Sequence, residues 1–290
     1  MAINPLPTQD TESTGSFRRI GELLAETAQL SEHDVKRVVA QQRKHGLRFG
    51  EAARKLGLVS EEDVQRALAQ QFRYPYMRRG ESSLDPMLVS AYQPYGNGAE
   101  AFRVLRSQLM LRWFNQGHKL LAVGSARGRT GASTVAANLA ISFAQLGERT
   151  LLIDANFRRP VQHTLFGISG EIGLSDALLG RWSVEKAVVS IAKLNGLAIL
   201  PAGPVAPNPH ELLSGRALHY LLELSKEICD VVIIDSPAIL EFPDAQMIGV
   251  RAEGYLLAAR RHHTRLADID AARDRLEPAR ATIVGSVVVD

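Results

Sequence analysis

Short runs of apolar residues alternate with segments of helical periodicity from about residue 100 to the end of the chain. Each run has the length of a buried β-strand, and the helical segments include 135–146 and 266–276. Strands that alternate with helices are typical of α/β proteins, so the pattern predicts a mostly parallel sheet with helices on both faces. The apolar runs cover residues 120–123, 151–153, 197–200, 231–234, 255–259 and 283–289.

The N-terminal part of the chain contains an internal repeat instead. A segment that begins at Ile20 recurs at Phe49, with a constant offset of 29 residues. In each copy a serine, Ser31 or Ser60, stands before acidic residues and a segment of apolar periodicity, as at a helix N-cap. The repeat therefore predicts a small domain built from two helix pairs.

These patterns divide the chain into four parts. We expect a flexible leader at 1–16, the helical domain at 17–77, a linker rich in tyrosine, proline and glycine at 78–98, and the α/β domain at 99–290.

Composition and charge narrow the function classes. The 46% hydrophobic content can supply a sizeable core, so the chain is not a disordered protein. The single cysteine, Cys229, excludes an intramolecular disulfide framework and fits a reducing compartment. The net charge of +3 is slight and the basic residues are scattered, which argues against nucleic-acid binding. No apolar run approaches the ~18 residues that cross a bilayer, so we expect a cytoplasmic protein that reaches the inner face of the membrane only through a partner.

The loop after the first apolar run has the features of a phosphate-binding loop. The template of Ala or Gly, four residues, Gly-Lys and then Ser or Thr fits Ala126 to Ser133 at every position except Ala132, where the lysine should stand. Backbone N–H groups of such a loop, with a helix N-terminus behind them, form a concavity suited to phosphate oxygens. The expected nucleotide contacts are Arg127, Gly128, Arg129, Thr130, Gly131, Ala132, Ser133 and Thr134.

The missing lysine changes what this loop can do. A lysine places a point charge on the β- and γ-phosphates, so its loss weakens binding and weakens phosphoryl transfer further. Arg127 or Arg129 could replace it, and the alternative is that both arginines are solvated and the loop is a structural relic.

Acidic residues follow two of the apolar runs. Asp154 ends the run at 151–153 and Asp235 ends the run at 231–234. Doubly wound sheets place functional groups at the carboxyl ends of their strands. Together with Ser133, these carboxylates predict a Mg²⁺ site beside the loop.

An amphipathic helix precedes the first strand of the α/β domain. Its apolar residues Phe102, Leu105 and Leu109 are predicted to lie on one face, with Arg103 and Arg106 on another. A solvated charged face is the simplest interpretation of these arginines.

The order of these motifs resembles the bacterial tyrosine autokinases (BY-kinases), in particular the chain-length-determinant kinases of the EpsG type in exopolysaccharide biosynthesis. The matching motifs are Glu100-x-x-Arg103-x-x-Arg106, the phosphate loop, Asp154-x-x-x-Arg158, the Pro-Asn-Pro loop with Asn208 and Pro209, and Asp235-x-Pro.

The resemblance implies a P-loop NTPase-like fold, Mg·ATP binding and a protein-tyrosine kinase. It also implies docking on a membrane polysaccharide co-polymerase and catalytic roles for Asp154, Arg158 and Asp235. It further implies homo-oligomers joined through Glu100, Arg103 and Arg106, and a place near the adenine or a facing subunit for Asn208 and Pro209.

One further position departs from that family. Asn156 stands where the kinases have a second aspartate, and an amide can neither take a proton nor bind Mg²⁺ with full charge. The sequence thus predicts a nucleotide-binding kinase-like protein of weak catalytic power.

The helical repeat resembles the N-terminal domain of type II secretion ATPases, whose tandem form can bind cyclic di-GMP. Ile20, Phe49 and Ala53 depart from that family's leucines, and a protein-docking module is the alternative.

Two other hypotheses remain open for the whole chain. One is a non-enzymatic oligomeric scaffold that senses cyclic di-GMP or a protein. The other is a deviant-Walker partitioning ATPase, with Arg127 at the place of a signature lysine, although the helical domain and the Pro-Asn-Pro loop argue against it.

Overall fold

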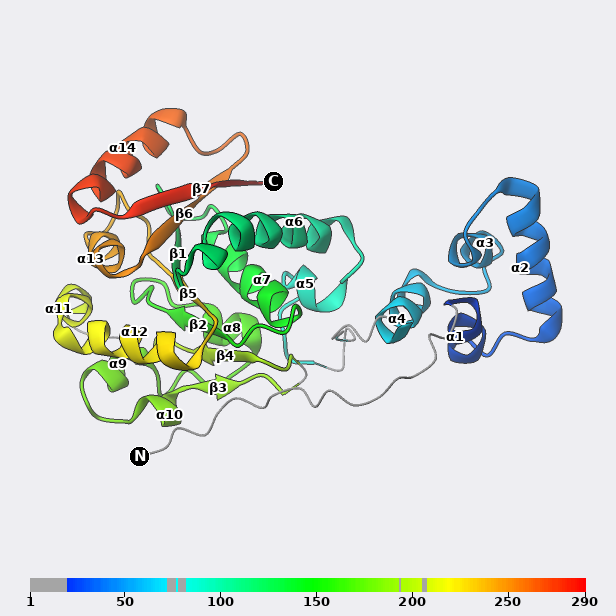
Figure 1. Ribbon diagram of the computed structural model, residues 1–290, viewed down its shortest axis with the longest axis horizontal. Helices are drawn as coiled ribbons and strands as arrows, with labels where there is room; N and C mark the ends of the chain where they lie inside the picture. Colours follow the sequence, from blue (N-terminus) through cyan, green and yellow to red (C-terminus); the bar gives the residue numbers. More distant parts are fainter. Residues whose placement is uncertain (1–19, 72–76, 78–81, 193, 205–207) are drawn as a thin grey trace.

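The computed structural model describes residues 20–71, 77, 82–192, 194–204 and 208–290, and the predicted leader lies outside these ranges. Over the described ranges, one sheet has the strand order β3-β4-β2-β5-β1-β6-β7 (Figure 1). All neighbouring strands are parallel except β3, which is antiparallel to β4. The strands are β1 (Leu120–Ser125), β2 (Thr150–Asp154), β3 (Val189–Ser190), β4 (Leu197–Leu200), β5 (Val231–Asp235), β6 (Gly254–Arg260) and β7 (Thr282–Val289).

Helices cover both faces of this sheet, as predicted. Successive strand residues point to opposite faces, so Leu121 and Val123 pack into one core while Leu120 and Ala122 pack into another. The first core is covered by α5 (Val89–Tyr92), α6 (Asn97–Arg112), α7 (Ala132–Ala144) and α8 (Gln162–Phe166). The second is covered by α9 (Leu174–Leu178), α10 (Val184–Ala187), α11 (Pro209–Ser214), α12 (Arg216–Ile228), α13 (Asp244–Arg251) and α14 (Leu266–Leu276).

Most predicted elements are confirmed, with small shifts at their ends. The helix α14 has the predicted bounds, whereas α7 ends at Ala144 and leaves Leu146 half exposed, so the prediction of a helix up to Leu146 is wrong. The two-residue strand β3 and two short 3₁₀-helices, η1 (Phe114–Gln116) and η2 (Glu277–Ala279), are not predicted from the apolar pattern. Cys229 is buried, and its burial raises the pKa of the thiol to about 11, which agrees with an inert core residue.

Each copy of the N-terminal repeat forms two helices, α1 (Ile20–Thr27) and α2 (Glu32–His45) in the first copy and α3 (Phe49–Lys55) and α4 (Glu61–Gln71) in the second. In the fold the two copies interleave, since α1 packs against α4 and α2 packs against α3. Ser31 Oγ accepts a hydrogen bond from Asp34 N at 3.1 Å, and Ser60 Oγ accepts one from Asp63 N at 3.1 Å. Both predicted N-caps are therefore confirmed. A separate apolar core, which includes Leu24 and Val38, holds these helices together.

The segment predicted as a linker is largely part of the α/β core. Leu84, Leu88 and Tyr92 are buried in the cluster that covers β1 and α7. Ser90 N donates to Asn138 Oδ1 of α7 at 2.9 Å. Residues 82–98 thus pack as an integral layer of the α/β domain.

The arginines of α6 do not share one face. Arg103 pairs with Glu100, but Arg106 is only 9% exposed, and its Nη1 donates to Ser142 O of α7 at 2.7 Å. The prediction that Arg106 lies on a face away from the apolar residues is wrong, because its side chain is buried against α7 and its guanidinium donates to the backbone of that helix.

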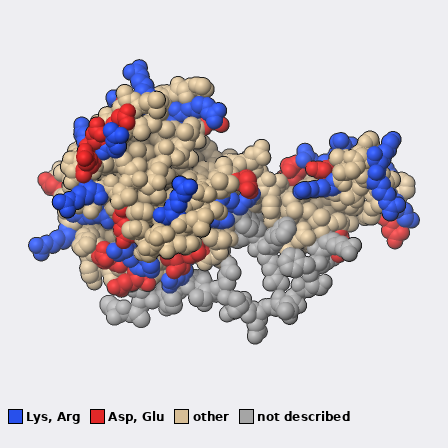
Figure 2. All heavy atoms as spheres, turned by 45° about the horizontal axis from the view of Figure 1, so that its top comes forward, with Lys and Arg blue, Asp and Glu red and all other residues tan. Residues whose placement is uncertain are grey.

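The surface shows no large region of a single charge sign on the face seen in Figure 2, where acidic and basic side chains are interspersed. No helix in the described part of the chain is both long and apolar enough to cross a bilayer.

Candidate functional site

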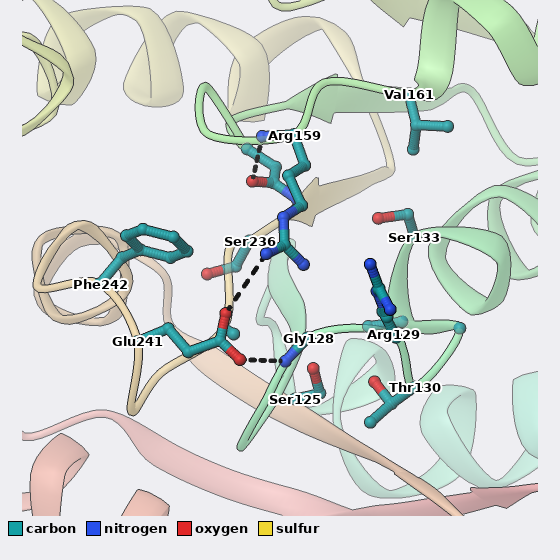
Figure 3. Close-up of a pocket in the computed structure, with 14 residues that line it drawn as sticks. Ser125, Gly128, Arg129, Thr130, Ser133, Arg159, Val161, Ser236, Glu241 and Phe242 are labelled. Atoms are coloured by element: carbon teal, nitrogen blue, oxygen red, sulfur yellow. Dashed lines mark hydrogen bonds and ion pairs between the residues drawn. The ribbon is translucent and has the colours of Figure 1, made fainter.

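The phosphate-loop motif joins β1 to α7 and opens into a cavity of about 400 Å³ (Figure 3). Gly131 caps α7 with a φ of +85°, a left-handed conformation that glycine adopts without strain. Ala132 begins the helix and Val135 N donates to Gly131 O, so the first-turn amides of α7 remain directed at the loop. The cavity is lined by Ser125, Gly128, Arg129, Thr130, Gly131, Ala132 and Ser133 of this region, by Asn156, Arg159 and Val161 after β2, and by Ser236, Ala238, Glu241 and Phe242 after β5.

Ser133 and Asp235 meet beside this loop, as the sequence pattern predicts. Ser133 Oγ donates to Asp235 Oδ1 at 3.0 Å. Gln162 Nε2 donates to Asp235 Oδ2 at 2.7 Å and to Ser133 O at 3.0 Å, so this buried amide clamps the two residues together.

Asp154 lies opposite Asp235 on the neighbouring strand and is fully buried. Its Oδ1 accepts from Asn156 N at 3.1 Å, and its Oδ2 accepts from the amides of Val161 and Gln162, each at 3.0 Å. Both oxygens are thus taken by the turn that follows β2. In this structure Asp154 shapes that turn and does not line the cavity.

The two buried carboxylates make the site favourable for added positive charge. Burial raises the pKa of Asp154 to about 6, although three backbone N–H donors oppose this. Burial and the neighbouring Asp154 carboxylate raise the pKa of Asp235 well above its usual range. Burial disfavours an unpaired carboxylate, so either a proton or a cation is stabilised here.

The residues present fit a magnesium–nucleotide complex. Among the described residues there is no group of three or more His, Cys, Asp or Glu side chains that could hold a metal ion. Mg²⁺ at phosphate sites needs only one or two side-chain oxygens beside waters and substrate phosphates. Ser133 lines the cavity, and the buried Asp235, which does not line it, stands directly behind Ser133 as its hydrogen-bond acceptor. The buried Thr130 Oγ1 has no hydrogen-bond partner and lines the cavity, so it is available to a ligand oxygen.

The four arginines of the motifs have different surroundings. Arg127 Nε donates to Asp268 of α14 at 3.0 Å, and Arg127 does not line the cavity. Arg129 lines the cavity with a left-handed backbone, at a φ of +62°. Arg158, predicted to be catalytic, is paired with the buried Asp244 at 2.6 Å. Arg159 points into the cavity (Figure 3).

Three polar residues beside the loop are not predicted from the sequence. Gln162, Arg159 and Glu241 all contact the loop or its acidic partners. Arg159 directly follows the predicted Arg158, and a second arginine in the same motif is the one signal that points to it. Gln162 and Glu241 belong to no recognisable motif. They reach the site through turns, and the pattern of apolar residues does not predict the path of a turn.

The Pro-Asn-Pro loop is partly described. Asn208 precedes α11 and its Nδ2 donates to Glu211 Oε2 at 3.2 Å, while Pro209 opens the helix. Neither residue lines the phosphate-loop cavity.

Comparisons with known proteins agree with this architecture. Residues 118–240 match the family described as cellulose biosynthesis protein BcsQ. The tyrosine-protein kinase YwqD of Bacillus subtilis (strain 168) is 34% identical over 210 residues, which cover 71% of this chain and 87% of that protein. The tyrosine-protein kinase etk of Escherichia coli is 33% identical over 195 residues, but the chain spans only 27% of its length.

Solved structures place the fold among P-loop NTPase-like proteins. The kinase domain of Escherichia coli Etk superposes with a TM-score of 0.69 and 31% identity, covering 73% of this chain and 83% of that one. The septum site-determining protein MinD of Pyrococcus horikoshii, complexed with Mg-ADP, gives a TM-score of 0.52 at 25% identity, over 59% of this chain and 70% of its own. The predicted fold class is confirmed, and the chain belongs to the family of bacterial tyrosine-protein kinases.

Proposed function

We propose that this protein binds Mg·ATP in the phosphate-loop cavity and acts as a weakly catalytic tyrosine-kinase-like regulator of exopolysaccharide or capsule biosynthesis. Its partner would be a membrane polysaccharide co-polymerase that it meets at the inner face of the membrane. The family match to a cellulose biosynthesis protein and the kinase relatives support this assignment.

One observation carries the proposal: the hydrogen bond of 3.0 Å between Ser133 Oγ and Asp235 Oδ1 at the first turn of α7. Ser133 and Asp235 would hold Mg²⁺, which when bound neutralises charge on the phosphates. The amides of residues 128–134 would hold the phosphate oxygens. Gln162 keeps Ser133 and Asp235 in register through its two hydrogen bonds.

Three other residues of the site argue for slow phosphoryl transfer. Ala132 offers no ammonium group, and Asn156, which lines the cavity, has no carboxylate to accept a proton from an attacking hydroxyl. Asp154 accepts three backbone hydrogen bonds and is fully buried, so it is poorly placed to act as that base. Binding therefore outweighs turnover in what this site does.

Calorimetry with Mg·ATP and Mg·ADP tests the proposal. We expect micromolar binding by the wild type, and the Ser133→Ala variant should bind Mg·ATP about tenfold more weakly, as for the loss of roughly 1.4 kcal/mol. The exposed Ser107, which donates to Arg103 O on α6, provides the matched control Ser107→Ala. A wild-type chain that is folded and binds neither nucleotide would refute the proposal.

A second candidate function is a non-enzymatic scaffold. A contact of the helical domain favours the scaffold. Tyr95, just before α6, donates through its Oη to Leu68 O of α4 at 3.2 Å. This hydrogen bond links the helical domain to the region of the Glu100–Arg106 motif. A signal received by the helical domain could then reach a self-association surface on α6. Binding of cyclic di-GMP without binding of either adenine nucleotide, in the same calorimetric series, would favour this candidate.

A further inference from the structure

The phosphate loop lacks the ammonium group that such loops use, and the structure offers another cation in its place. We propose that Arg159 supplies the positive charge that Ala132 cannot, and that Glu241 occupies the phosphate position until a nucleotide displaces it. The inference rests on the proposed nucleotide binding and names two residues of that same site.

Arg159 reaches the loop from the turn after β2. Its backbone N donates to Asn156 Oδ1 at 3.2 Å and to Asn156 O at 3.1 Å, which fixes the direction of the side chain. A Cβ placed on Gly128 would lie 2.6 Å from Arg159 Nη1, so the guanidinium approaches the loop backbone closely because residue 128 is a glycine. The planar guanidinium can donate two parallel hydrogen bonds to a phosphate.

Glu241 accepts from one donor that a phosphate would use and forms an ion pair with the other. Its Oε1 accepts from Gly128 N at 2.8 Å, and its Oε2 lies 3.9 Å from Arg159 Nη2 (Figure 3). A carboxylate that accepts from a loop amide and lies near a guanidinium has the charge and the position of a bound phosphate edge. Glu241 therefore marks the anion position of this cavity.

The contact is suited to exchange. The side chain of Arg159 is 58% exposed and that of Glu241 is 29% exposed, so their ion pair is screened by solvent and contributes little stability. A phosphate that replaces the carboxylate restores the hydrogen bond to Gly128 N and leaves Arg159 with an anionic partner. Glu241 thus acts as a built-in competitor of the nucleotide.

The two departures from the kinase motifs complement one another in this arrangement. An aspartate at position 156 would place a second carboxylate next to the Arg159 backbone and compete with a phosphate for its guanidinium. The neutral Asn156 holds the turn by accepting the Arg159 N–H without that competition. The loss of the lysine and the loss of the aspartate are thus consistent with one another.

Isothermal calorimetry with Mg·ATP tests both residues. We expect Glu241→Gln to bind Mg·ATP several-fold more tightly than the wild type, and Arg159→Ala to bind it about tenfold more weakly, as for the loss of one charge-assisted contact. Arg159→Lys should retain part of the affinity, and Ala132→Lys added to Arg159→Ala should restore it. The matched controls are Arg181→Ala, which removes an exposed arginine paired with Asp176, and Glu223→Gln, which removes one of the two acidic partners of Lys226.

The outcomes separate the inference from the proposed function. If the wild type binds Mg·ATP and neither Glu241→Gln nor Arg159→Ala changes the affinity, the inference is wrong while nucleotide binding stands. If Arg129→Ala weakens binding and Arg159→Ala does not, the cation is Arg129 and the inference is again wrong. If the folded wild type and Glu241→Gln both fail to bind, the proposed function falls and the inference falls with it.

Discussion

Two neighbouring arginines of one motif have opposite surroundings. Arg159 faces the cavity, whereas Arg158 Nε donates to Asp244 Oδ2 at 2.6 Å and Arg158 Nη2 donates to Asp244 Oδ1 at 3.3 Å. The Arg158 guanidinium also lies over the ring of Phe242, 5.2 Å from its centroid. Asp244 is 1% exposed, so the arginine that the family resemblance assigns to catalysis neutralises a buried carboxylate in this structure.

Replacement of Arg158 should therefore lower the stability of the fold, whatever its effect on activity. In Arg158→Ala, the one basic group that remains near Asp244 among the described residues is His210, whose Nδ1 lies 3.8 Å from Oδ1. We therefore expect a loss of about 3 kcal/mol in the free energy of unfolding, typical of an unpaired buried charge. Urea unfolding at neutral pH measures this loss. Arg159→Ala serves as the control and should unfold at the wild-type midpoint; equal midpoints for both variants would show that Arg158 has no structural role.

A second ion pair allows a test of pH dependence away from the site. Arg149 donates to both Asp230 oxygens, at 3.0 and 2.7 Å, and these hydrogen bonds hold the pKa of Asp230 below its usual value. A carboxyl whose pKa is lower in the folded state adds stability above the unfolded pKa of about 3.9, and that stability is lost as the pH falls through the lower folded value.

Asp230→Asn should therefore be less stable than the wild type at pH 7 and at pH 5, by no more than about 1 kcal/mol because the pair is partly exposed. The difference should shrink as the pH falls below about 4, where the unfolded carboxyl takes up a proton, and it should vanish once the folded carboxyl is neutral as well. Urea midpoints of the two proteins measured across this range give the result directly. A difference that stays constant down to pH 3 would exclude the ion pair as its cause.

At the scale of elements, apolar runs and N-cap serines predict the strands and helices well. Each of the six predicted strands is present, because a buried parallel strand needs an apolar run whatever its neighbours are. The strand β3 has only two residues and pairs at the sheet edge, so no run marks it. Ser133 and Asp235 are predictable because each ends a local motif, whereas Glu241 and Gln162 depend on where a turn places a side chain.

The helix α6 shows why a face predicted from spacing can be wrong. A pattern of i,i+3 charges specifies positions around the helix but not which neighbouring helix packs there. Arg106 lies against α7, where its Nη1 donates to Ser142 O and its Nε has no hydrogen-bond partner. Arg103 is partly exposed, pairs with Glu100 and donates through Nη1 to Pro94 O.

Arg106→Ala is expected to lower the free energy of unfolding by roughly 1.5–3 kcal/mol, the usual range for a hydrogen bond that involves a charged group. Arg103→Ala should lower it by about 1 kcal/mol, because this partly exposed arginine loses its pair with Glu100 and its hydrogen bond to Pro94 O. Urea unfolding separates the two variants. If Arg103→Ala stays folded but loses the self-association seen by sedimentation, the motif helix is an interface. A wild-type stability for Arg106→Ala would contradict the packing role.

At the scale of the whole molecule, the boundary between the helical domain and the α/β domain is the feature that the amino-acid composition predicts least well. Tyrosine, proline and glycine suggest a linker over 78–98, but burial of the segment depends on long-range partners. Tyr92 Oη donates to Leu84 O at 2.5 Å, and Asn138 Nδ2 of α7 donates to Met87 O at 3.0 Å. Met77 N donates to Ala91 O at 3.0 Å and its side chain is buried in the same core.

Two shortened chains test where the α/β domain begins. A chain that starts at Met77 keeps this layer and should unfold cooperatively, with a urea midpoint near that of the sheet domain in the full protein. A chain that starts at Ala99 loses Leu84, Leu88 and Tyr92, which are 6%, 0% and 4% exposed. The loss of each large apolar side chain from a core lowers the free energy of unfolding by about 2–5 kcal/mol. The free energy of unfolding of a whole domain is about 5–15 kcal/mol, so this chain should be unfolded or molten. Circular dichroism and urea titration of the two chains provide the measurement, and equal stability would show that residues 82–98 cover the core without supporting it.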